Sequence, residues 1–233
     1  DLAGQGFTPP DAAARALLEG AFGNSAYLAR LALREAGTLE QYFAAGPEAV
    51  VAAARAAALA VAGLAEEAEA MAELRQAKRR TALAIALADI AGLWDLEAVT
   101  GALSRFADAC VHGRLRFLLA QAAARAGLAD RDPARLEDTT GLIVLAMGKY
   151  GAFELNYSSD IDLVVFYDAA RFPFAKKDDP RAAAVELVRG LVKLLAERGG
   201  GDYVFRVDLR LRPDAGATQV AISTDAALDY YKA

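Results

Sequence analysis

The sequence predicts an α+β protein, in which an all-α helical array precedes a domain with a small mixed sheet. Two observations lead to this prediction. Apolar residues recur at helical spacing through residues 11–127, and near residue 131 the period changes to the apolar runs and alternation of strands. We therefore divide the chain of 233 residues into a helical region, 1–130, and a second domain, 131–233.

Glycine, proline and capping residues set the expected helix boundaries in the first region. Residues 38–41 fit a capping box, and Pro47 suits the first turn of the next helix. Asp95 is expected to cap a long helix that runs to about Ala126. Helix C-termini are expected at four glycines: Gly37, Gly63, Gly92 and Gly127.

The second domain is expected to contain three strands. Residues 141–147 form an unbroken apolar run, which is typical of a strand buried on both faces. Residues 160–167 form a second strand, and residues 203–212 alternate between one apolar and one charged face. Helices are expected over residues 151–159 (a short helix and a loop), 180–198 (ended by glycines 199–201) and from about 224 onward.

Composition excludes several kinds of chemistry. A single cysteine cannot form an internal disulfide, and Cys110 with His112 cannot supply the ligands of a zinc site. We expect Cys110 in the core and His112 on the surface or in a cap. The basic cluster at 78–80 is expected to be a solvated helix face.

The charge and hydropathy patterns favour a cytoplasmic protein without nucleic-acid or membrane partners. The 26 basic and 31 acidic residues give a net charge of −5, and neither half has the positive excess of a nucleic-acid binder. The most apolar long run, 49–65, is too weakly hydrophobic for a membrane span, and no export leader opens the chain.

Three aspartates can form an oxygen-only metal site. Period two places Asp160 and Asp162 on one side of a strand, about 7 Å apart. Asp208 lies on the charged face of another strand, so the three carboxylates converge if the two strands are neighbours. Such ligands suit Mg²⁺ or Mn²⁺, and a metal pair can assist displacement at phosphorus. The alternative is that Asp-x-Asp is only the solvated start of a strand.

Small and polar residues near these aspartates could approach a phosphate. Gly148 and Lys149 follow the first strand, and Ser158 and Ser159 directly precede Asp160. A glycine, eleven residues and then Asp-Ile-Asp-Leu is the spacing of the nucleotidyltransferase superfold related to DNA polymerase β.

Two longer strings resemble one enzyme family. They are VLAMGKYGAFELNYSSDIDL at 144–163 and YVFRVDLRLRPD at 203–214, and residues 74–92 add to them. They closely resemble bifunctional glutamine synthetase adenylyltransferase/adenylyl-removing enzymes. That family carries two nucleotidyltransferase domains: the N-terminal one removes AMP from a synthetase tyrosine using phosphate and releases ADP, and the C-terminal one adds AMP from ATP. Residues 154–162, with two serines, look more like the removing copy.

The resemblance implies roles for individual residues. Asp160, Asp162 and Asp208 would bind metal, with two Mg²⁺ ions expected and Mn²⁺ as an alternative. Residues near the nucleotide or attacking phosphate would be Gly148, Lys149, Ser158 and Ser159. Arg210 and Arg212 would either bind anionic oxygens or balance the carboxylates.

The predicted function is metal-dependent phosphorolysis of adenylyl-tyrosine on glutamine synthetase. The alternatives are addition of AMP from ATP and a catalytically silent module that binds nucleotide or docks a partner. The family also implies a PII-type signal protein acting on the full-length enzyme. We expect the chain to be a fragment that ends within its catalytic domain.

Overall fold

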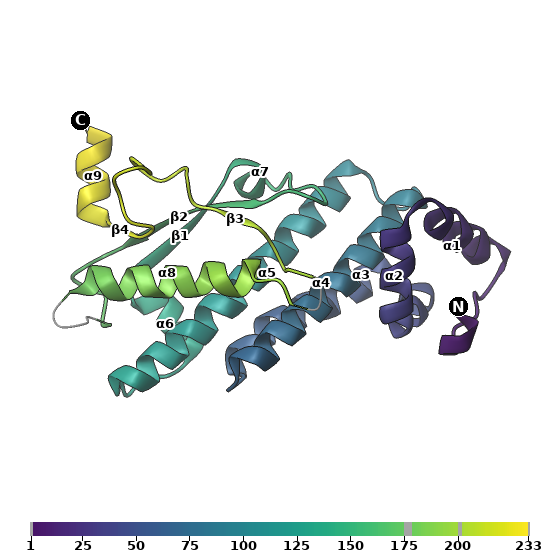
Figure 1. The fold of residues 1–233 in the computed structure, drawn as a ribbon, viewed down its shortest axis with the longest axis horizontal. Helices are drawn as coiled ribbons and strands as arrows, with labels where there is room; N and C mark the ends of the chain where they lie inside the picture. The colour runs from purple at the N-terminus through teal and green to yellow at the C-terminus, as the bar shows by residue number, and fades with distance from the viewer. Residues whose placement is uncertain (1, 175–178, 200–201, 233) are drawn as a thin grey trace.

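The computed structural model describes residues 2–174, 179–199 and 202–232 and has the predicted α+β architecture (Figure 1). α1 and α2 lie at one end of the molecule, and the C-terminal helix lies at the other. The helices and 3₁₀ turns of the first half are η1 (Ala3–Gln5), α1 (Ala12–Asn24), α2 (Ala26–Arg34), α3 (Ala36–Ala60), η2 (Val61–Gly63), α4 (Glu67–Ile90) and α5 (Leu96–Ala126).

Several predicted helix boundaries are confirmed. Gly127 adopts φ of +68° directly after α5, and Gly92, with φ of +65°, follows Ala91, the C-cap residue of α4. The Asp95 carboxylate accepts a hydrogen bond from Ala98 N at 2.8 Å and caps α5. α3 is kinked at Gly46 (φ +85°), so Pro47 begins its second arm as expected, and Gly63 closes η2 after α3.

Two expectations at the start of α3 are wrong. Gly37 does not end a helix but is the second residue of α3. Residues 38–41 do not form a capping box, because the N-cap position belongs to Glu35 and Thr38 is buried inside the helix. The connection between α2 and α3 is a single residue, Glu35, whose side chain is bound by arginines of α4. Tertiary contacts therefore decide this boundary.

α4 and α5 form the centre of a continuous core that joins the two halves of the chain. Phe106 and Phe117 of α5 are fully buried, and the Phe106 ring lies 6.0 Å from that of Phe205. Cys110 is buried beside them, as predicted. His112 is half-exposed and lies 2.5 Å from Glu137 Oε1, which agrees with its predicted surface position. The predicted boundary at residues 130/131 falls in the connection between α5 and α6.

One helical stretch among the described residues, Ala36–Gly63, is long and apolar enough to cross a membrane by length and composition. It is kinked at Gly46, and its residues Val50, Ala54 and Ala58 are buried where α3 packs on α4 and α5. A core helix meets the same criterion, so this stretch does not indicate a membrane protein.

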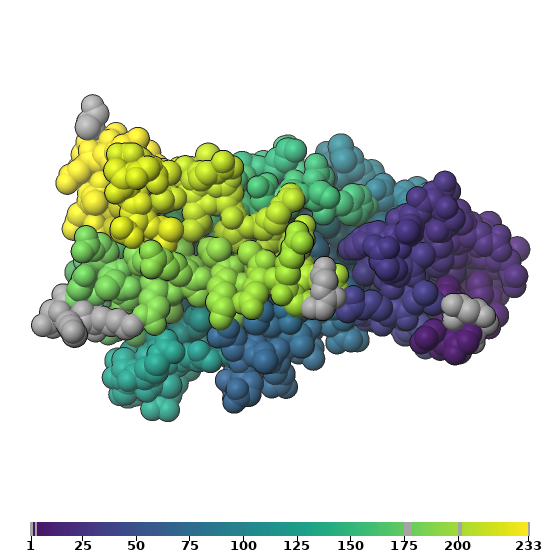
Figure 2. Space-filling model, viewed as in Figure 1, coloured from purple at the N-terminus to yellow at the C-terminus, as the bar shows by residue number. Residues whose placement is uncertain are grey.

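The second half forms a small mixed sheet with β2 in its centre. β1 (Leu142–Met147) is antiparallel to β2 (Ile161–Tyr167), and the short strands β3 (Val207–Asp208) and β4 (Ile222–Ser223) are parallel to it. α8 packs on α5, and in Figure 2 the green and yellow C-terminal segment covers one face of the helical array. The helices of this half are α6 (Pro133–Thr139), α7 (Gly148–Gly151), α8 (Pro180–Ala196) and α9 (Thr224–Lys232).

Two strand predictions are corrected. β1 is not buried on both faces, because it lies at the sheet edge and leaves Ile143 and Leu145 40% and 43% exposed. The predicted strand at 203–212 is reduced to two residues. Val204 and Phe205 both donate their backbone N–H groups to Leu195 O at the end of α8, so this backbone leaves the sheet. Of the glycines expected to end α8, 200 and 201 lie outside the described residues.

Candidate active site

The sheet brings two of the predicted carboxylates together. β2 and β3 are parallel neighbours, and their register places Asp162 opposite Asp208. Asp160 immediately precedes β2, and Ile161 N donates to Arg206 O at 2.9 Å, which holds the start of the strand beside the segment before β3. The sequence-based condition that the two strands be neighbours is therefore met.

The carboxylates interact electrostatically. The pKa of Asp162 is raised, first because the group is partly desolvated and then because Asp160 and Asp208 place negative charge beside it. Arg210 acts in the opposite direction. A site with this arrangement favours a nearby cation.

Arg210 already provides one such cation. Its Nε donates to both carboxylate oxygens of Asp208 at 3.0 and 2.9 Å, and its backbone N donates at 2.8 Å. These hydrogen bonds hold the pKa of Asp208 below its usual value. Of the two roles predicted for Arg210, the structure shows charge balance with Asp208.

The carboxylates fit a hard metal ion in chemistry. All three offer only oxygen, and desolvation together with repulsion from Asp160 and Asp208 raises the pKa of Asp162. In the described part of the chain no three acidic or histidine side chains form a group already shaped around a metal. The Asp208 carboxylate is paired with the Arg210 guanidinium, so a metal ion bound by Asp208 would have to displace this guanidinium.

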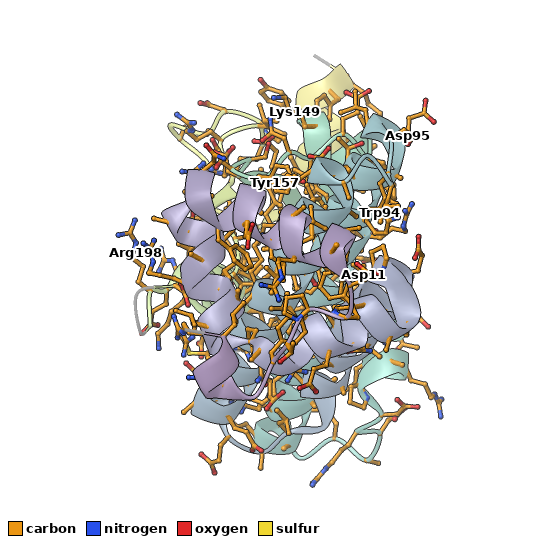
Figure 3. All side chains as sticks on the ribbon, turned by 90° about the vertical axis from the view of Figure 1, so that its right-hand side faces the viewer. Asp11, Trp94, Asp95, Lys149, Tyr157 and Arg198 are labelled. Atoms are coloured by element: carbon orange, nitrogen blue, oxygen red, sulfur yellow. The ribbon has the colours of Figure 1, made fainter. Side chains whose placement is uncertain are left out.

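Gly148 fits closely against Asp162. Its φ is +54°, and a Cβ at this position would lie 2.6 Å from Asp162 Oδ2. Both observations require glycine here. The neighbouring Lys149 is exposed at the start of α7, and Figure 3 shows it on the same side of the molecule as Tyr157.

The two serines belong to a tight loop before β2. Ser159 Oγ donates to Asn156 Oδ1 at 2.9 Å, and the Ser158 carbonyl accepts a hydrogen bond from Arg206. Both residues therefore belong to the loop that leads into Asp160. Arg212 differs, because its guanidinium donates to the carbonyls of Leu209, Ala215 and Thr218 and braces the loop after β3.

Sequence reasoning missed the residues through which the helices hold the site loops. Tyr150 OH donates to Asp108 on α5, and Tyr157 OH donates to Asp89 on α4, both at 2.8 Å. Leu155 N also donates to Ser104 Oγ of α5 at 3.3 Å. No local pattern could reveal these pairs, because 42 to 68 residues separate their members.

The prediction of a solvated basic face at 78–80 is wrong. The Lys78 ammonium lies 4.0 Å above the ring of Phe205, and Arg79 Nε donates to the buried Glu35 at 2.6 Å. Arg80 is the most exposed of the three and also binds Glu35. The cluster faces the α2–α3 junction and the segment before β3, which cover it.

A small mixed sheet, carboxylates that face each other on neighbouring strands and a tight glycine turn against one of them agree with the nucleotidyltransferase class that the sequence predicts. Comparison with known proteins agrees. The family model described as glutamate-ammonia ligase adenylyltransferase matches residues 16–233, so the chain belongs to this family.

Its relatives include bacterial proteins named bifunctional glutamine synthetase adenylyltransferase/adenylyl-removing enzyme. The chain is 44% identical to that of Caulobacter vibrioides over 91% of its length and 21% of the relative. Identity to that of Xanthobacter autotrophicus is 47%, over 94% of the chain and 22% of the relative. The identity to the protein of Rhodopseudomonas palustris strain HaA2 is 52%, over 75% of the chain and 18% of the relative. The chain thus spans about a fifth of the length of these relatives.

Proposed function

We propose that this chain catalyses removal of AMP from adenylylated glutamine synthetase by phosphorolysis. The observation that carries the proposal is the position of Asp162 opposite Asp208, with Asp160 at the start of the same strand. The names of the relatives include both removal and addition of the adenylyl group. The two serines at 158 and 159 support removal, because residues 154–162 resemble the removing copy of the family.

The reaction is a displacement at phosphorus. An oxygen of inorganic phosphate bonds to the adenylyl phosphorus while the bond from that phosphorus to the tyrosyl oxygen breaks. The products are ADP and a free tyrosine hydroxyl, which takes up a proton. The carboxylates Asp160, Asp162 and Asp208 would hold Mg²⁺, or Mn²⁺, which would stabilise negative charge on the entering and leaving oxygens.

The other residues position the phosphate groups. Gly148 leaves space for a close approach beside Asp162, and Lys149 is an exposed cation next to it. Ser158 and Ser159 would donate to phosphate oxygens from the other side. Arg210 holds Asp208 in place before the metal binds and would then be free to meet an anionic oxygen.

The test supplies adenylylated glutamine synthetase, phosphate and Mg²⁺ and measures ADP. We expect ADP from the wild-type chain and a loss of at least about 100-fold in the Asp160→Asn, Asp162→Asn double variant. Asp214→Asn is the matched control, because Asp214 lies in the loop after β3 at φ +43°, which asparagine also adopts. Full activity in the double variant would contradict the proposal.

The second candidate is addition of AMP from ATP, which the names of the relatives also include. Labelled ATP and unmodified synthetase distinguish it, because only addition transfers label to the synthetase. A catalytically silent module would bind nucleotide without any dependence on Mg²⁺. In the whole enzyme we place the reaction in the cytoplasm and under the control of a PII-type signal protein.

A further inference from the structure

A cavity of about 500 Å³ lies directly beside the carboxylate site. It is enclosed by α2, α4, the loop at 157–159 and the segment at 202–205. Ser158 and Ser159 form part of its wall, and Asp160 is the next residue in the chain. The cavity therefore adjoins the proposed active site and shares Ser158 and Ser159 with it, while the rest of its wall comes from other residues.

The cavity wall carries positive charge that its own carboxylates do not balance. Asp202 is engaged by Arg34 at 2.9 Å and Arg79 at 3.6 Å, and Asp89 accepts from Tyr157 OH. Across residues 2–174, 179–199 and 202–232, no carboxylate forms an ion pair with Arg75 or Lys78, the remaining two cations of the wall. The Lys78 ammonium instead rests on the Phe205 ring.

Arg114 of α5 is a further buried cation, which does not line the cavity but is close enough to Arg75 for the two charges to repel. Arg114 of α5 is fully buried, and none of its three guanidinium nitrogens has a hydrogen-bond partner among the described residues. Burial, opposed by attraction to Glu67 and assisted by repulsion from Arg75, lowers the pKa of Arg114 to about 10. The Arg114 guanidinium lies 5.0 Å from the Phe117 ring, and an anion bound at Arg75 would offset the repulsion between the two arginines.

We propose that the cavity binds a phosphate group against Arg75 and Lys78, either as free phosphate or as part of a nucleotide. The aromatic residues of the wall, Tyr27, Tyr157, Tyr203 and Phe205, would pack on a base carried by that phosphate. Anion binding in this cavity requires none of the three carboxylates. A negative result in the binding experiment would therefore not contradict the proposed reaction.

The affinity should fall as the pH rises. Burial lowers the pKa of Lys78 to about 8, and a bound anion would raise it. The ammonium is charged below this pH and becomes neutral above it. The other titratable or charged groups facing Lys78 or the cavity are Arg75, Arg79 and Asp89 of α4, Cys110 and Arg114 of α5, Tyr27 of α2, and Tyr157, Asp202 and Tyr203.

The experiment titrates the whole chain with sulfate, which stays a dianion from pH 6 to 9, and measures the heat of binding. We expect saturable binding that weakens at least tenfold in Lys78→Met and in Arg75→Gln. Only Lys78→Met should also remove the pH dependence. Arg80→Gln, on the same helix but outside the cavity, should change the affinity less than twofold.

Two further measurements make the result decisive. The Lys78 pKa, followed by the ¹³Cε resonance, should start near 8 and rise when sulfate is added. AMP binding more tightly than phosphate identifies a nucleotide as the ligand, and equal affinity identifies free phosphate. The proposal is overturned if sulfate does not bind, if Lys78→Met and Arg75→Gln bind it as the wild type does, or if adenosine binds as tightly as AMP.

Discussion

At the scale of single residues, the site depends on how tightly Gly148 is placed against Asp162. Only a residue without Cβ allows this approach, since any Cβ would lie 2.6 Å from the carboxylate oxygen. The charged form of this carboxylate is also destabilised, because desolvation and the negative charges of Asp160 and Asp208 all raise the pKa of Asp162. A small displacement here should therefore have a large effect on the chemistry.

We predict that Gly148→Ala lowers the rate of ADP formation by at least about tenfold, because the methyl group displaces Asp162. Gly92→Ala is the control, since Gly92 also has positive φ (+65°) but open space around it. It should lose about 1 kcal/mol of stability and keep its activity. Equal activity in the two variants, measured with the coupled ADP assay, would refute the role of the close contact.

At the scale of elements, the hydrogen-bond partners of the backbone decided the length of the strand predicted at 203–212, which the sequence pattern could not. Residues 203–212 alternate well enough for a long strand, yet only Val207–Asp208 pairs with β2. The preceding N–H groups bond to Leu195 O of α8, and Arg212 braces the following loop. Alternation reports the faces of a strand only where a neighbouring strand exists to pair with it.

The crossing of α3 and α5 gives a prediction about stability. A Cβ on Gly113 would lie 2.0 Å from Ala58 O, so the two helices touch at their backbones. We expect Gly113→Ala to destabilise the chain by about 1–3 kcal/mol. The melting temperature should fall by roughly 3–10 °C in calorimetry. A Cβ on Gly20 in α1 would have no neighbour within 4 Å. Gly20→Ala should therefore leave the melting temperature unchanged or raise it.

The contact between α5 and α6 predicts that the stability of the fold depends on pH. The hydrogen bond to Glu137 raises the pKa of His112 above 6.5, against a smaller effect of burial. The contribution of the His112–Glu137 interaction to the free energy of unfolding is therefore complete below the His112 pKa of the unfolded chain, about 6.5. This contribution is lost as the pH rises through the His112 pKa of the folded chain. Because His112 is half-exposed, the loss should stay below about 1 kcal/mol.

Urea unfolding at pH 6 and pH 8 should show this loss in the wild type and not in His112→Gln. A wild type that gains stability relative to the variant over this range would contradict the predicted sign.

At the scale of the whole molecule, the helical array serves as the support on which the site loops are fixed. Asp108 of α5 holds Tyr150 directly after Gly148 and Lys149, and Asp89 of α4 holds Tyr157 before the serines. Figure 1 shows both helices running beneath the sheet. The geometry of the site thus depends on residues far from it in sequence.

We predict that Tyr150→Phe lowers kcat about tenfold and destabilises the chain by about 1–3 kcal/mol. The reason is that Asp108 loses its buried donor and α7 loses its anchor. Tyr231→Phe, on the exposed face of α9, is the matched control and should behave as the wild type. Unchanged kcat with lowered stability would limit Tyr150 to a purely structural role.

Local patterns were sufficient for most of the fold, and they selected the residues of the candidate site. Helical periodicity, Gly92, Gly127 and Asp95 predicted the long helices, because these signals act within one or two turns. The aspartates were visible because period two and a specific motif surround them. The boundary at Glu35 was missed because its partners are more than 40 residues away, on α4.

By itself, the sequence determined the α+β class, the long helices α4 and α5 and the choice of the three carboxylates, since short-range periodicity and spacing encode them. Only the tertiary structure decided which groups meet across the chain. In the folded chain Asp162 lies opposite Asp208, and Arg210 forms hydrogen bonds with Asp208. The Arg212 guanidinium donates to the loop after β3, and the Lys78 ammonium lies over the Phe205 ring. The physical reason is that burial and pairing of charge depend on neighbours brought together by packing, which no local pattern records.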